Sequence, residues 1–153
     1  MGMYTEVFFA AEVDEHAYQI LREVIDTGSL NGDGHAFFDK PRAALVFRGS
    51  SAYFPGANHA IVEVDDWGSG PAARACYVSF RANLKNYDGE IEAFFDWVKP
   101  HCVDTNFIGY SMYEEAESPT LQYVIPPGAE TDQSDTEQHT TSVIPPGSTE
   151  ADQ

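Results

Sequence analysis

The sequence is poor in cysteine and has no long hydrophobic run. Cys76 and Cys102 are the only cysteines among 153 residues, and they form no C-x-x-C or zinc-finger spacing. This excludes a disulfide-stapled fold and a cysteine-based metal site. No apolar run reaches the roughly 18 residues of a membrane-spanning helix, and the first residues lack the basic start of a signal peptide. We therefore expect a cytoplasmic protein with reduced thiols.

Positive charge is also scarce, because no Lys or Arg follows Lys99. Eight basic residues face 25 acidic ones, which gives a net charge of −17. Residues 1–125 account for −11 of that charge and residues 126–153 for −6. Such a field repels nucleic-acid phosphates and anionic lipids. The sequence therefore argues against nucleic acid and membranes as partners, and it is compatible with a basic protein partner.

The end of the chain repeats itself and changes composition. VIPPGAETDQ at 124–133 returns as VIPPGSTEADQ at 143–153, and residues 126–153 contain no Phe, Trp or Tyr and no Lys or Arg. A segment of this kind buries too little apolar surface to offset the entropy lost on ordering. We predict one folded domain at 1–125 and a disordered tail at 126–153. The second copy is either a neutral duplication or a mobile strand end, Val143 and Ile144, that binds a partner by strand addition.

Within 1–125, hydrophobic periodicity predicts alternating strands and two amphipathic helices. The helices are expected at 14–28, with Asp14 as N-cap and Gly28 as C-cap, and at 86–100. Period-two alternation predicts strands at 3–13, 58–66, 73–85, 106–115 and 120–125, and a further β-rich segment at 41–56. The order β-α-β-β-β-α-β-β indicates an α+β fold. We expect a mostly antiparallel sheet of five to six strands with both helices on one face, a ferredoxin-like variant.

No residue set in the sequence matches a known catalytic or metal-binding pattern. Asp65 and Asp66, and the cluster Glu114, Glu115 and Glu117, resemble solvated turns and match no EF-hand loop. The pair His101-Cys102 has no neighbour in sequence that completes a metal site, and His16 is expected to be exposed. We therefore predict no catalytic residue, no cofactor and no metal, and the sequence favours a binding protein over an enzyme.

One predicted surface has the composition of a protein-binding site. If the helices cover the face of strand 73–85 that carries Val78 and Phe80, then Tyr77 and Arg81 lie on the opposite face. Arg48 and Tyr53 from the preceding β-rich segment are expected to join them. Tyr and Arg are enriched at interface hot spots. The alternative is ordinary cross-strand salt bridging of Arg81 with Glu63 and Asp65.

Four phrases of the chain are similar to a family of small phage proteins. These are MYTE at 3–6, SAYF at 51–54, the run NLKNYDGEIEAFFDWVKP at 83–100 and GYSMYEEAESPTLQY at 109–123. Over most of residues 3–123 the chain resembles small proteins encoded by tailed phages and prophages. That family has no established activity, cofactor or catalytic residue. The resemblance implies a phage gene product acting in the bacterial cytoplasm.

These observations lead to one main hypothesis and two alternatives. The main hypothesis is a non-enzymatic phage accessory protein that binds an unidentified host or phage protein, with self-association left open. The first alternative is an acidic DNA mimic that inhibits a basic host enzyme. The second is a small metal-dependent or nucleotide-sequestering protein that uses the carboxylates at 65–66 or 114–115.

Overall fold

The chain folds into one β-sheet with helices packed against it. The computed structural model describes residues 3–51, 59–66, 74–103 and 106–125. In chain order the elements are β1 (Thr5–Val13), α1 (Glu15–Thr27), the 3-10 helix η1 (Ala36–Asp39), α2 (Leu45–Arg48), β2 (His59–Asp66), β3 (Arg74–Leu84), α3 (Glu90–Val98), the 3-10 helix η3 (Lys99–His101), β4 (Phe107–Tyr113) and β5 (Thr120–Tyr123).

The described strands form a single antiparallel sheet in the order β2-β3-β1-β4-β5. β1 lies at the centre, where Phe9 is paired with Phe80 of β3 and with Gly109 of β4. β2 and β5 lie at the edges. The predicted α+β class with an antiparallel sheet is therefore confirmed.

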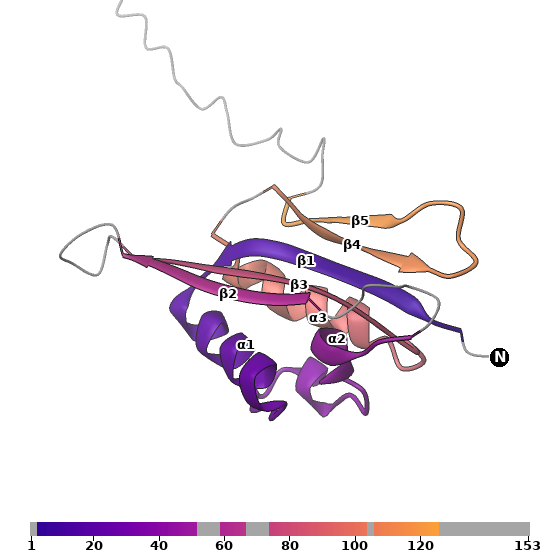
Figure 1. The fold of residues 1–153 in the computed structure, drawn as a ribbon, viewed down its shortest axis with the longest axis horizontal. Coiled ribbons are helices and arrows are strands. Elements are labelled where there is room, and N and C mark those ends of the chain that lie inside the picture. Colours follow the sequence, from indigo (N-terminus) through magenta and orange to yellow (C-terminus); the bar gives the residue numbers. More distant parts are fainter. Residues whose placement is uncertain (1–2, 52–58, 67–73, 104–105, 126–153) are drawn as a thin grey trace, which may run out of the picture.

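Figure 1 shows α1, α2 and α3 on the same side of the sheet. The inward residues of β1 and β3 alternate with polar or half-exposed ones, as a strand with one buried face requires. The core between the layers is rich in aromatic rings, with Phe94 of α3 near its centre. The buried phenylalanines of this core are Phe9, Phe37, Phe47, Phe80, Phe94 and Phe95.

Both predicted caps of α1 are present. The Asp14 carboxylate accepts a hydrogen bond from the Ala17 amide at 2.9 Å, which satisfies a donor that the first helical turn leaves unpaired. Gly28 adopts the left-handed conformation at φ 76°, and its N–H donates to the Val24 carbonyl. The local sequence thus sets where this helix begins and ends.

The strand prediction for 41–56 is wrong over its described part, residues 41–51. The chain there forms a turn and then α2, Leu45–Arg48. Ala43, Val46 and Phe47 are all buried, and their i, i+3, i+4 spacing is a helical period that gathers them on one face. Among the described residues, three α-helices therefore cover the sheet, one more than predicted, and α2 takes the place of the strand expected around Leu45–Arg48.

The second predicted helix is shorter than expected. Its regular part, α3, begins at Glu90 because Gly89 adopts φ 70° and ends the preceding turn. Tyr87, which lies within the predicted helix 86–100, precedes α3 and is exposed, and the Arg42 guanidinium lies 5.2 Å from its ring centroid. Trp97 in α3 is buried.

Of two other predictions, the structure bears on the absence of a membrane-spanning helix and does not test the tail. Among the described residues, no helix has both the length and the apolar character that crossing a membrane would require. The tail prediction for 126–153, with strand addition by Val143 and Ile144, falls outside the described residues. It stays a prediction.

Candidate functional site

The face of the sheet opposite the helices carries a row of side chains that crosses four strands. In antiparallel pairing, directly opposed residues point to the same face. Arg81 of β3 is opposite Phe8 of β1, Phe8 is opposite Tyr110 of β4, and Tyr110 is opposite Leu121 of β5. We call Arg81, Phe8, Tyr110 and Leu121 the sheet-face row. No helix among the described elements lies on this side (Figure 1).

The polar end of the row is built around a buried carboxylate. Glu6 is only 3% exposed. Its Oε2 accepts hydrogen bonds from Arg81 Nε at 3.0 Å and Nη2 at 2.7 Å, and its Oε1 accepts one from the Tyr110 hydroxyl at 2.6 Å. A carboxylate removed from water is tolerated only when it is paired in this way. Glu6 therefore holds Arg81 and Tyr110 in fixed positions on the face.

These contacts shift the ionisation of both partners of Glu6. Burial, followed by the hydrogen bond to Glu6, raises the pKa of Tyr110 to about 12. The hydrogen bond to Glu6 also raises the pKa of Arg81. At neutral pH the Tyr110 hydroxyl is therefore a neutral donor, and Arg81 is positively charged.

The rest of the row is apolar and accessible. The rings of Phe8 and Tyr110 stack with centroids 5.4 Å apart, and Leu121 on the edge strand is 50% exposed. Tyr77, further along β3 on the same face, is 39% exposed. Rigid aromatic rings beside a fixed guanidinium match the composition of interface hot spots.

Next to Glu6, the face contains a buried side-chain amide for which the described residues supply no hydrogen-bond partner. Asn83 is opposite Glu6 in the β1–β3 register and is 1% exposed. Within the part of the chain that the structure describes, neither Nδ2 nor Oδ1 of Asn83 forms a hydrogen bond. A buried polar group in this state costs about 1–3 kcal/mol of stability.

We expect Asn83→Val to stabilise the protein. The substitution removes the unpaired amide and places a β-branched residue in a central strand, so the free energy of unfolding should rise by about 1 kcal/mol. Urea denaturation measures this change in the free energy of unfolding. Asn83→Asp is the matched opposite change, because it puts a carboxylate beside Glu6, and it should destabilise. An unfolding free energy that falls in Asn83→Val would mean that the amide has a partner in solution.

The predicted binding residues are brought together only in part. Tyr77 and Arg81 share the uncovered face of β3, as expected. Arg48 does not join them: it ends α2 on the helical side of the sheet, next to Gly28, where a Cβ would meet its guanidinium. The misassignment of 41–56 as a strand caused this error. Tyr53, Val143 and Ile144 lie outside the described residues.

Four residues of this face were not predicted: Glu6, Phe8, Tyr110 and Leu121. The alternation of β1 already placed Glu6 and Phe8 opposite the core residues Val7 and Phe9. What the sequence did not contain is the strand order, which sets β1 between β3 and β4 and so makes Arg81, Phe8 and Tyr110 neighbours. The alternation of each strand indicates which of its residues share a face, but the sequence does not indicate which strands are neighbours.

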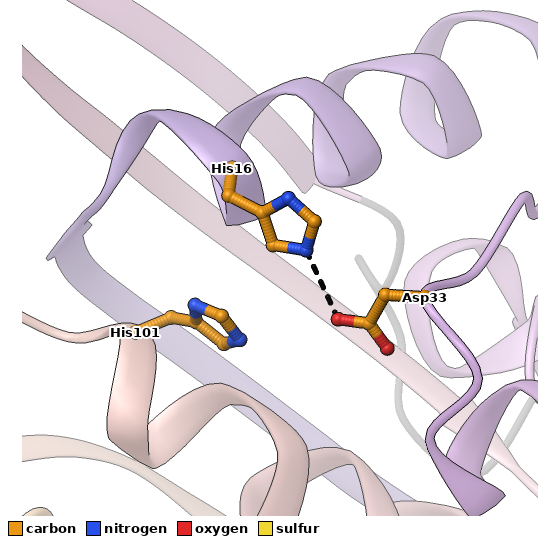
Figure 2. Close-up of side chains that lie close together, drawn as sticks. All are labelled: His16, Asp33 and His101. Atoms are coloured by element: carbon orange, nitrogen blue, oxygen red, sulfur yellow. Dashed lines mark hydrogen bonds and ion pairs between the residues drawn. The ribbon is translucent and has the colours of Figure 1, made fainter.

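A second group of polar residues gathers on the helical side. His16 lies in the first turn of α1, Asp33 lies in the loop after α1, and His101 ends η3. One potential metal-ligand atom from each lies within 4.8 Å of the others, the one such group of three among the described residues. Figure 2 shows the three side chains converging, with His16 Nε2 3.0 Å from Asp33 Oδ2. We call these residues the two-histidine cluster.

Further hydrogen bonds orient the two-histidine cluster. His101 Nδ1 lies 2.8 Å from Asp14 Oδ2, and the Trp97 indole N–H donates to Asp33 Oδ2 at 3.0 Å. The indole hydrogen bond, with a smaller contribution from His16, lowers the pKa of Asp33 to about 2. Asp33 is therefore a carboxylate throughout the physiological range.

The structure tests one of the two carboxylate clusters considered from the sequence. Among the described residues, Glu114, Glu115 and Glu117 do not form a group of potential metal ligands like the two-histidine cluster. The side chains of Asp65 and Asp66 are outside the described set. His101 has no neighbour in sequence that completes a metal site, but folding brings His16 and Asp33, which are distant in sequence, to its side chain.

No family model, no curated protein and no solved structure matches the chain.

Proposed function

We propose that this chain is a non-enzymatic protein-binding module whose contact surface is the sheet-face row together with Tyr77. The observation that carries the proposal is the row of Arg81, Phe8, Tyr110 and Leu121 across four strands, on the side of the sheet where no described helix lies. A sheet with one covered and one uncovered face offers a flat, rigid surface. Fixed aromatic and guanidinium groups bind without losing much side-chain entropy.

The partner that fits this surface is a basic protein. The chain has a net charge of −17, and a field of that size speeds the approach of a positively charged protein and slows that of an acidic one. Once the partner is docked, the exposed Leu121 and the Phe8–Tyr110 stack supply apolar contact area. The acidity thus favours encounter, and the row supplies the contact.

The biological setting of the proposal comes from sequence resemblance. We propose a phage accessory protein that binds a host or phage protein in the bacterial cytoplasm, on the strength of the phrases at 3–6, 51–54, 83–100 and 109–123. For the fold we propose a ferredoxin-like variant. The order β2-β3-β1-β4 with helices on one face supports it, and β5 is then an additional edge strand.

Affinity capture with matched variants tests the proposal. The full-length chain, Leu121→Ser and Leu45→Ser serve as baits in lysates of infected and uninfected bacteria. Leu45 is the control because it is 43% exposed on α2, on the helical side. We expect the wild type and Leu45→Ser to retain the same basic protein, and Leu121→Ser to retain at least tenfold less. Capture should also weaken as salt rises, because charges attract the partner.

Three results would contradict this assignment. Equal capture by Leu121→Ser and the wild type would remove the row from the interface. Loss of capture with Leu45→Ser alone would move the interface to the helical side. A dimer of the chain that Leu121→Ser dissociates would identify a second copy, and not a basic protein, as the occupant of the face.

A further inference from the structure

We propose that the two-histidine cluster binds a divalent transition-metal ion, with Zn²⁺ as the best fit, through His16, Asp33 and His101. This site is separate from the sheet-face row, since it lies on the helical side of the sheet. The proposal rests on the convergence of three side chains from α1, from the loop after it and from η3 (Figure 2).

The donor set determines the class of ion. Two imidazole nitrogens and one carboxylate oxygen form the three-ligand combination found in zinc sites that keep a fourth position for water, and also in non-haem iron sites. Mg²⁺ and Ca²⁺ prefer oxygen ligands, so the two histidines select against them. The chemistry therefore points to Zn²⁺, with Co²⁺ as a spectroscopic substitute.

The three ligand atoms need to move only slightly to surround a zinc ion. A tetrahedral zinc ion with bonds of about 2.0–2.1 Å holds its ligand atoms about 3.4 Å apart. His16 Nε2 and Asp33 Oδ2 are already 3.0 Å apart, and no pair of the three ligand atoms is separated by more than 4.8 Å. His16 is exposed and lies in the first turn of α1. It can therefore adjust its side chain without disturbing the core.

The surrounding contacts are those of a supported metal site. A metal-binding histidine usually donates its second ring N–H to a carboxylate, which fixes the ring and the tautomer. His101 Nδ1 is 2.8 Å from Asp14 Oδ2, and with Nδ1 engaged there, Nε2 is the nitrogen left to bind an ion. Asp33 is in turn held by the Trp97 indole at 3.0 Å, and the rings of Trp97 and His101 lie 5.4 Å apart.

Asp14 has two roles that one substitution can separate. Its Oδ1 caps α1 through the Ala17 amide, while its Oδ2 contacts His101. Asn is as good an N-cap as Asp, so Asp14→Asn should preserve the helix. It replaces the acceptor facing His101 Nδ1 with an amide donor, and the loss of such a partner typically weakens metal binding about 10–100-fold.

Titration of the full-length chain with Zn²⁺, followed by calorimetry and thermal unfolding, tests the site. We expect Zn²⁺ to raise the melting temperature of the wild type and bound Co²⁺ to give the visible absorption of a tetrahedral site. His16→Gln and His101→Gln should each bind Zn²⁺ at least tenfold more weakly. His139→Gln, which changes a tail histidine outside the cluster, should bind like the wild type, and Mg²⁺ and Ca²⁺ should have no effect.

Other outcomes would overturn the proposal. Zn²⁺ binding that is unchanged in both His16→Gln and His101→Gln would place the ion elsewhere, and loss in His139→Gln alone would place it in the tail. No Zn²⁺ binding by the wild type would leave the cluster as a network of hydrogen bonds. If His101→Gln fails to fold, as judged by circular dichroism, His16→Gln and Asp14→Asn decide the question, because His16 is exposed and the cap is preserved.

Discussion

Phe94→Ala is expected to lower the free energy of unfolding by about 4 kcal/mol. Phe94 is fully buried. Its ring centroid lies 5.2–5.6 Å from those of five other phenylalanines, which come from β1, η1, α2, β3 and α3 itself: Phe9, Phe37, Phe47, Phe80 and Phe95.

The effect is large because so many elements meet at this one ring. Truncation to alanine removes its apolar burial and leaves a cavity lined by rings that cannot all move inward. Each edge-to-face pair adds about 0.5–1.5 kcal/mol beyond burial. A domain of this size has about 5–15 kcal/mol of stability, so the variant should unfold at a much lower urea concentration.

The matched control is Phe107→Ala. Phe107 is 44% exposed on β4, and its described ring contact is with Tyr123 alone, at 5.6 Å. We expect it to cost about 1 kcal/mol or less. Equal losses of unfolding free energy in the two variants would contradict the position of Phe94 at the centre of the core.

Arg81→Met is expected to cost about 2–3 kcal/mol of unfolding free energy. The substitution keeps most of the aliphatic length of Arg81 but removes both hydrogen bonds to Glu6 Oε2. Glu6 is then a buried carboxylate with the Tyr110 hydroxyl as its remaining described side-chain partner. The Arg81 side chain is 37% exposed, and water screens part of the interaction, so the loss should fall below the roughly 3–5 kcal/mol of a fully buried pair.

A double-mutant cycle isolates this interaction. Glu6→Met combined with Arg81→Met removes both charges, and the double variant should be more stable than Arg81→Met alone. Arg22→Met is the control, because Arg22 pairs with Asp26 at 3.5 Å while both side chains are more than half exposed. That change should stay within about 0.5 kcal/mol. If Arg22→Met lost as much unfolding free energy as Arg81→Met, removal of the charge alone, without burial, would explain the effect.

This prediction also affects how the binding surface can be tested. Arg81 belongs to the sheet-face row and at the same time stabilises the buried Glu6. A charge reversal at Arg81 would place two carboxylates together and would unfold the chain before it reported on any partner. Leu121 is half-exposed on an edge strand, so the substitution Leu121→Ser changes the surface without removing a core contact.

Most of the fold follows from local sequence, and the exceptions have local causes. β1, α1 and β3 were predicted because their periods are long and their caps, Asp14 and Gly28, are strong. α2 was missed because it is only four residues long, and over so short a run the pair Val46-Phe47 suits a strand as well as a helix. Because this segment was predicted as a strand, Arg48 was assigned to the wrong face of the sheet.

The candidate sites were less predictable, because each depends on contacts between distant segments. Tyr77 and Arg81 share one strand, so alternation alone placed them on one face. Tyr110 contacts Glu6 across 104 positions, and His101 meets Asp14 across 87. No spacing motif records such pairs, since they arise from strand order and from the docking of η3 beside α1.

The central claim is that the uncovered sheet face is the binding surface, and solution NMR of the chain with and without its captured basic partner tests it most directly. We predict that the amide signals of Phe8, Arg81, Tyr110 and Leu121 shift on binding, while those of α1 and α2 stay in place. Shifts that cluster on α1 and α2 and leave the sheet-face row unchanged would contradict the claim.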